Sequence, residues 1–123
     1  MLLLSRMRLI NWHYYDDQTI NFGNITLLAG DNGSGKSTVI DAMQYALVAD
    51  IRKVKFNSAA ASSRSSTRSL ESYCRCKLGM EGAEYRRGDT ITHVILEFTA
   101  PDRTFCAGIA AEAFTNGDVR ETQ

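Results

Sequence analysis

The chain has 123 residues, of which 44% are hydrophobic and 23% are charged, as in an ordinary globular domain. This composition excludes a disordered polar tail, and the length suffices for one hydrophobic core rather than two. Lysine and arginine together number 14, as do aspartate and glutamate, so the net charge gives no argument for a polyanionic partner. No apolar run approaches the roughly 20 residues that span a bilayer. We therefore expect a cytoplasmic protein without a membrane partner.

Two short strands are expected near the N-terminus. The second covers residues 18–22, and residues 11–17 between the strands read as a turn with three aromatic residues. The first covers residues 1–12, where apolar side chains alternate with others: Leu2, Leu4, Met7 and Leu9.

Residues 30–38 read GDNGSGKST and follow an apolar, strand-like run at 25–29. They match the pattern Gly, four residues, Gly-Lys-Ser/Thr between a strand and a helix, which binds phosphates. The glycines lack a Cβ, so the backbone N–H groups can approach a polyphosphate closely. Lys36 would hold the β and γ phosphates, and Ser37 would bind Mg²⁺. A helix that begins here adds its unpaired N–H groups and positive dipole end.

The sequence therefore predicts a site for ATP with Mg²⁺. Lys36 is the expected catalytic residue and Ser37 the expected metal ligand. Trp12 and His13 could flank the base or ribose, although aromatic residues near a turn more often pack in the core. A turn that merely caps a helix would not require Lys followed by Ser-Thr. The expected nucleotide contacts are Asn32, Gly33, Ser34, Gly35, Lys36, Ser37, Thr38 and His13.

A helix is expected over residues 36–49. Asp41 and Gln44 fall off its apolar stripe and read as solvated residues. The stripe would pack on a sheet, and it consists of Val39, Met43, Ala46 and Leu47.

Positive charge is concentrated in residues 51–88, which contain nine basic and three acidic residues. Within them, residues 52–68 read as a mobile basic segment rich in serine and alanine. Thr67 could cap a short helix that ends near Lys77. The cysteines are odd in number and lack metal-ligand spacing, so they are expected to be free buried thiols: Cys74, Cys76 and Cys106.

Strands are expected at residues 90–99 and 104–110, with turns at 101–102 and 116–117. Glu97 lies on the opposite face of the first of these strands and reads as a surface residue. The apolar face of that strand consists of Thr92, Val94, Leu96 and Phe98.

The run GDNGSGKSTVIDAM, some thirty residues from the N-terminus and after two short strands, resembles the heads of structural-maintenance-of-chromosomes (SMC) and RecF-like ATPases. Flanking words resemble the SMC-like JetC subunits of Wadjet anti-plasmid systems, which are related to MukB-type condensins. The resemblance spans about residues 3–100, and these words are LINWHY, LAGDN, ADIRK, SLESY and YRRG.

The resemblance implies an α/β fold of the ABC/SMC-head type. Residues 1–123 would be the N-terminal lobe, with antiparallel strands beside the phosphate-loop strand and helix, and without the coiled coil and C-terminal half. It also implies a second head across two ATP molecules, kleisin-type and accessory subunits, and DNA translocation or loop extrusion near the nucleoid. No acidic strand end or opposing signature is found in the sequence. This chain alone is therefore expected to bind ATP without hydrolysing it.

Two interpretations remain open for the basic segment and for the whole chain. Residues 52–68 could face DNA, or they could be a solvated loop or contact a partner subunit. The chain could also be a self-contained small P-loop nucleotide or metabolite kinase. The Asn-Gly-Ser interior of the loop, the preceding strand pair and the missing acidic strand favour the SMC-like head.

Overall fold

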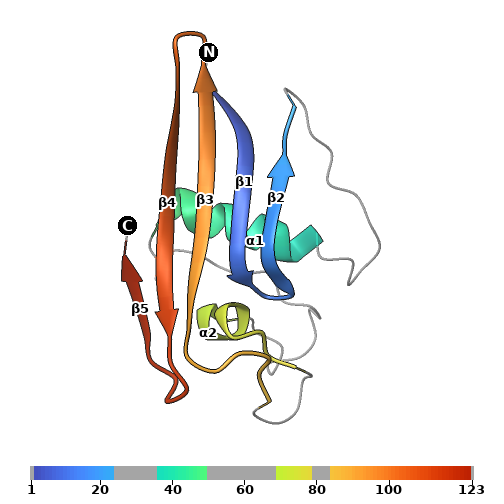
Figure 1. Ribbon diagram of the computed structural model, residues 1–123, viewed down its shortest axis with the longest axis vertical. Helices are drawn as coiled ribbons and strands as arrows, with labels where there is room; N and C mark the ends of the chain where they lie inside the picture. The colour runs from blue at the N-terminus through green and yellow to red at the C-terminus, as the bar shows by residue number, and fades with distance from the viewer. Residues whose placement is uncertain (1, 24–35, 50–68, 79–83, 123) are drawn as a thin grey trace.

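The computed structural model describes residues 2–23, 36–49, 69–78 and 84–122. These residues form a five-stranded antiparallel sheet in the order β2-β1-β3-β4-β5. Helix α1 crosses one face of the sheet, and α2 lies near the hairpin end of β1 (Figure 1). The elements are β1 (Leu3–Trp12), β2 (Tyr15–Asn21), α1 (Lys36–Val48), α2 (Leu70–Cys74), β3 (Thr90–Ala100), β4 (Arg103–Ala113) and β5 (Val119–Thr122).

The N-terminal hairpin is tighter than the sequence predicts. Trp12 of β1 already pairs with Tyr15 of β2, so the turn contains only residues 13–14, where residues 11–17 were expected. Trp12 is fully buried, and a side chain fixed in the core keeps the pairing regular up to the turn. His13 accordingly adopts a φ of 51°, an uncommon conformation for a residue with a Cβ. The second strand therefore starts three residues before the expected residue 18.

A β-bulge explains why the apolar alternation of β1 changes phase. Leu4 pairs with Phe98, whereas Arg6 pairs with Glu97, so Ser5 is an extra residue in β1. An inserted residue reverses which side chains face the core. Leu4 therefore packs against the same core as Met7 and Leu9.

The central strand β3 confirms the expected strand at residues 90–99. Thr92, Val94 and Leu96 are buried beneath α1, and Phe98 packs against the same core. Glu97 lies on the other face of the sheet, as expected. The turn at residues 116–117 is also confirmed, with Gly117 at a φ of 96°, and β5 follows it as a strand that we did not expect.

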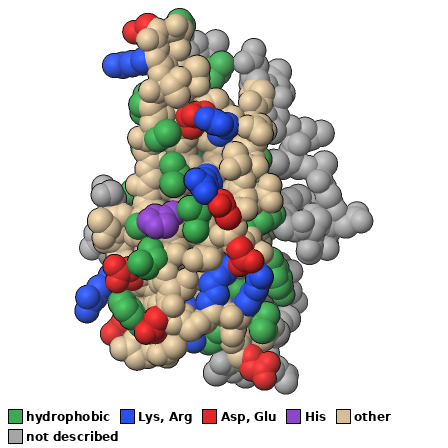
Figure 2. Space-filling model, in the orientation of Figure 1, with side chains coloured by type: hydrophobic (Ala, Val, Ile, Leu, Met, Phe, Trp, Pro, Cys, Tyr) green, Lys and Arg blue, Asp and Glu red, His purple; other side chains and the backbone are tan. Residues whose placement is uncertain are grey.

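The sheet face opposite α1 carries paired charges. Arg6 binds both carboxylate oxygens of Glu97 at 2.6 Å, and Arg8 contacts Asp17 at 2.7 Å. Blue and red side chains accordingly lie side by side on this face (Figure 2). The arginine hydrogen bonds lower the pKa of both carboxyl groups, so these groups stay charged at neutral pH.

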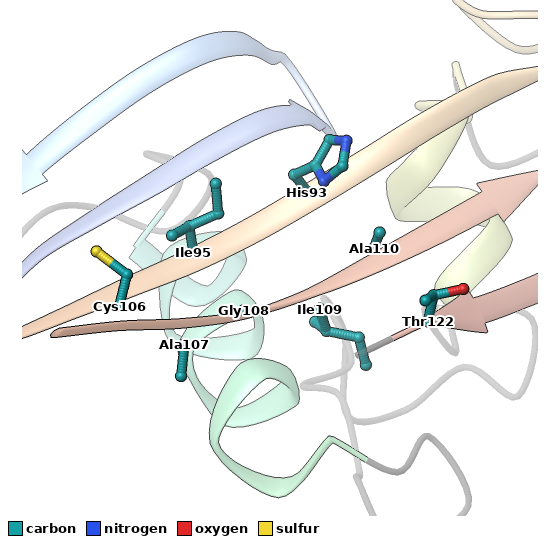
Figure 3. A pocket seen from close by; sticks show the side chains of 8 residues that line it. All are labelled: His93, Ile95, Cys106, Ala107, Gly108, Ile109, Ala110 and Thr122. Carbon is teal, nitrogen blue, oxygen red and sulfur yellow. The ribbon is translucent and has the colours of Figure 1, made fainter.

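A depression of about 260 Å³ lies over β3, β4 and β5 (Figure 3). Gly108 lines this depression and is opposite Ile95 in the strand pairing. A Cβ added to Gly108 would lie 2.9 Å from the carbonyl oxygen of Val94. Glycine is therefore required here by close backbone approach. The lining residues are His93, Ile95, Cys106, Ala107, Gly108, Ile109, Ala110 and Thr122.

Substitution Gly108→Ala is therefore expected to lower the free energy of unfolding by about 1–3 kcal/mol, because the strands must move apart to admit a methyl group. The measurement is urea denaturation followed by circular dichroism. Gly88→Ala is the matched control, since its added Cβ would meet no atom closer than 3.8 Å. Equal stability of the two variants would contradict this role of Gly108.

The cysteines are free thiols, but only two of the three are buried. Cys74 and Cys76 are in the interior, whereas Cys106 is exposed on β4, contrary to expectation. Cys106 pairs with Glu97 on the sheet face that α1 does not cover. Burial raises the pKa of the Cys74 thiol to about 11, so Cys74 is protonated at neutral pH and is a weak nucleophile.

Candidate nucleotide-binding site

Helix α1 begins at Lys36, which confirms the helix expected after the glycine-rich loop. Residues 24–35 lie outside the described residues, and so do the strand expected at 25–29, the predicted contacts Asn32, Gly33, Ser34 and Gly35, and the side chain of Lys36. Ser37 and Thr38 belong to the first turn of α1, whose backbone N–H groups have no partner within the helix. This turn contains no acidic residue. The N-terminal turn of a helix carries the positive end of the helix dipole and therefore suits a phosphate group.

The buried face of α1 includes three of the four expected stripe residues, because Met43 and Ala46 also pack against the core. Val39 is buried as predicted, but Leu47 is 58% exposed and Asp41 is completely buried. Gln44 is exposed, as expected. The buried residues of α1 are Thr38, Val39, Asp41, Ala42 and Tyr45. Tyr45, spaced at three and four residues from Ala42 and Asp41, was the sequence signal that could have identified this face.

Trp12 is at the centre of the core and contacts the first turn of α1. Its ring stacks on the Tyr73 ring, with centroids 4.5 Å apart, and on the Tyr45 ring, with centroids 6.0 Å apart. Its indole Nε1 donates a hydrogen bond of 3.0 Å to the carbonyl oxygen of Thr38. Trp12 is thus a packing residue that attaches the hairpin turn to the beginning of α1.

His13 lies at the same turn and faces α2. Its backbone N–H donates to the carbonyl oxygen of Tyr73 at 2.6 Å, and its ring meets the Tyr73 ring edge-on. Its Nδ1 is 3.7 Å from the sulfur of Cys76. Because Trp12 contacts Thr38, the turn that carries His13 is close to the start of α1.

Helix α2 completes the surroundings of α1. It starts after Ser69, whose side chain accepts a hydrogen bond from the Ser72 backbone while Ser72 bonds back to Ser69. This capping box sets the start of the helix, and Thr67, which the sequence suggested as a cap, lies outside the described residues. The hydroxyl of Tyr73 donates to the buried carboxylate of Asp41. The sequence did not single out Tyr73, because its role depends on a partner 32 residues away.

Several arginines of the basic region have structural roles. Arg86 and Arg87 both bind Asp16 at the hairpin, at 2.7 and 2.9 Å. The hydrogen bond from Arg87 lowers the pKa of the Asp16 carboxyl group. Arg75 pairs with Glu71 and stacks over the ring of Tyr85. These three arginines therefore form ion pairs within the fold. The expected basic segment at 52–68 lies outside the described residues.

Within the described ranges, no group of three or more histidine, cysteine or acidic side chains could hold a metal ion. A search of the same residues found no helix with the length and apolar character needed to cross a membrane. Ser37 is in the first helical turn, where a hydroxyl ligand for nucleotide-bound Mg²⁺ would be placed.

Comparison with known proteins gives a family match around this site. Residues 4–63 match the family model described as the P-loop containing region of AAA domain. The chain is 40% identical over 55 residues to the DNA double-strand break repair Rad50 ATPase of Thermoplasma acidophilum, covering 44% of this chain and 6% of that protein. The corresponding Thermoplasma volcanium protein is 38% identical over 52 residues, covering 42% of this chain and 6% of its own length.

The match to a second kind of relative covers a larger part of this chain. The chromosome partition protein MukB of Haemophilus ducreyi is 37% identical over 76 residues, covering 60% of this chain and 5% of MukB. The chain thus spans only a small fraction of the length of these relatives. Residues 30–38 lie inside the region that the family model matches. The geometry of α1 and these matches together support a P-loop region of an SMC-like ATPase head in this chain.

Proposed function

We propose that this chain is the nucleotide-binding part of an SMC-like ATPase head and binds ATP with Mg²⁺ through residues 30–38. The observation that carries the proposal is the sequence GDNGSGKST running into a helix whose first turn lacks acidic residues and is attached to the core. Lys36 would neutralise the terminal phosphates, and Ser37 would hold the metal ion. The Mg²⁺ ion supplies charge stabilisation when phosphate is transferred.

The nucleotide contacts are proposed for the same residues that the sequence singled out. Asn32, Gly33, Ser34 and Gly35 would offer backbone N–H groups, and Thr38 would complete the first turn. His13 is proposed to flank the base or ribose. Support for His13 comes from its neighbour Trp12, which contacts Thr38 at the beginning of α1.

The wider activity is proposed from the relatives, which are named for DNA repair and chromosome partition. Two heads would dimerise across two ATP molecules and couple hydrolysis to DNA translocation or loop extrusion, with kleisin-type and accessory subunits, at the nucleoid in the cytoplasm. Because the flanking sequence words resemble JetC, we propose that the chain acts in an anti-plasmid complex. Residues 52–68 would contribute phosphate contacts through Arg52, Lys53, Lys55, Arg64 and Arg68.

Hydrolysis measurements test this proposal. The full-length protein is expected to hydrolyse ATP only with Mg²⁺, because the acidic magnesium partner and the opposing signature would come from other parts of the dimer. A fragment of residues 1–123 is expected to release no phosphate above the buffer control, while the full-length protein turns over under identical conditions. The assay is phosphate release, and adding duplex DNA to the full-length protein should change its rate.

The alternative is a small kinase that is complete within this chain, since such enzymes use the same loop. It predicts the opposite result for the fragment. Steady phosphate release or transfer by residues 1–123 would replace the SMC-like proposal with this one. Absence of Mg-ATP binding in the full-length protein would exclude both.

A further inference from the structure

The second turn of α1 buries a carboxylate group beside the core. Asp41 is 0% exposed, and the hydroxyl of Tyr73, which is 1% exposed, donates a hydrogen bond to it. Burying a carboxylate is unfavourable unless hydrogen bonds replace its hydration. The hydrogen bond between Asp41 and Tyr73 therefore favours one position of α1.

The buried apolar side chains in the first two turns of α1 are small, whereas the large buried side chain of this helix, Tyr45, lies in the next turn. Val39 and Ala42 are the buried apolar residues of its first two turns. Such short side chains allow a helix to rotate or slide by a fraction of a turn at little cost, whereas hydrogen bonds are directional. The bond from Trp12 to the Thr38 carbonyl and the bond from the Tyr73 hydroxyl to Asp41 both hold the first two turns of α1. In the next turn, the Tyr45 hydroxyl donates to Glu121 at 2.7 Å.

Tyr73 is itself fixed on three sides. The Ser69–Ser72 capping box defines the start of its helix. Its carbonyl oxygen accepts the backbone N–H of His13, and its ring stacks on Trp12 at an interplanar angle of 14°. The position of the Tyr73 hydroxyl beside α1 is thus fixed by contacts that include the β1–β2 hairpin.

We propose that Asp41 is a positioning residue that acts through α1 on the Mg²⁺ ligand Ser37. The two residues are four apart, so they share one face of the helix and lie about 6 Å apart along its axis. Any rotation of α1 at Asp41 therefore displaces the Ser37 hydroxyl. The inference rests on the proposed function, because it assumes that Ser37 binds the metal ion of Mg-ATP.

The test compares two variants that lose the same chemical group. Tyr73→Phe removes the hydroxyl bound to Asp41. Tyr85→Phe removes a hydroxyl that donates at 3.2 Å to Glu71, a residue of α2 and not of α1. ATP affinity of the full-length protein is measured by calorimetry with Mg²⁺ and with excess chelator, well below each unfolding midpoint. Tyr73→Phe should weaken Mg-ATP binding about tenfold while changing Mg²⁺-free binding less than twofold. Tyr85→Phe should change neither.

A second variant keeps the test decisive if Tyr73→Phe folds poorly. Asp41→Asn retains an oxygen that can accept the Tyr73 hydroxyl, and it should bind Mg-ATP more tightly than Tyr73→Phe does. Unchanged Mg-ATP affinity in Tyr73→Phe would overturn the inference, and so would equal losses with and without Mg²⁺, which would indicate general destabilisation. Failure of the wild-type protein to bind Mg-ATP would instead overturn the proposed function on which it rests.

Discussion

Replacing Lys36 by alanine is expected to weaken binding of Mg-ATP by at least about 30-fold. The reason is that removing one partner of a hydrogen-bonded charge pair costs about 2–5 kcal/mol, which corresponds to that factor or more. The effect should be visible by calorimetry with Mg²⁺ on the full-length protein. Ser37→Ala is expected to weaken binding in the same direction, because the metal ion loses its hydroxyl ligand.

Lys77→Ala is the matched control for Lys36→Ala. Lys77 follows α2 and forms an isolated β-bridge with Tyr85. It is half-buried, and it is distant in sequence from the phosphate loop. Its removal should leave ATP affinity unchanged. Undiminished affinity in the Lys36 variant would remove residues 30–38 from the mechanism.

Trp12→Ala is expected to lower the free energy of unfolding by about 3–5 kcal/mol, which is a large part of the stability of a domain of this size. Trp12 is fully buried, and two tyrosine rings lie against it. Its loss would leave a cavity beneath α1 and remove the indole hydrogen bond to Thr38. Urea denaturation followed by far-ultraviolet circular dichroism measures the change, since the variant has no tryptophan fluorescence.

Two further variants serve as controls for Trp12→Ala, one for loss of an aromatic ring at the surface and one for loss of the indole hydrogen bond alone. Tyr14→Ala changes an aromatic residue of the same turn that is 61% exposed, and surface substitutions of this kind shift stability by about 0.5 kcal/mol or less. Trp12→Phe retains a stacked ring but lacks the N–H donor, so its stability should lie between wild type and Trp12→Ala. A Trp12→Ala variant as stable as Tyr14→Ala would contradict the central role of this residue.

The phosphate loop could be predicted from the letters because its chemistry is local. A loop that surrounds phosphates needs glycines, a lysine and a hydroxyl at fixed spacing, and residues 30–38 contain all of them. The strand at residues 90–99 was equally readable, since an apolar residue at every second position leaves one choice of buried face. Its register confirms that choice, including the outward position of Glu97.

Contacts between distant segments decided the rest. Asp41 reads as a solvated helix residue until Tyr73 brings a hydroxyl to it. Arg86 and Arg87 read as free positive charge until the hairpin brings Asp16 to them. A charged side chain can be buried or neutralised only by a partner that the fold supplies, and these partners are 32 to 71 residues away in the sequence. The sequence alone therefore predicts the phosphate loop, whereas the contacts that support the following helix were decided by tertiary packing.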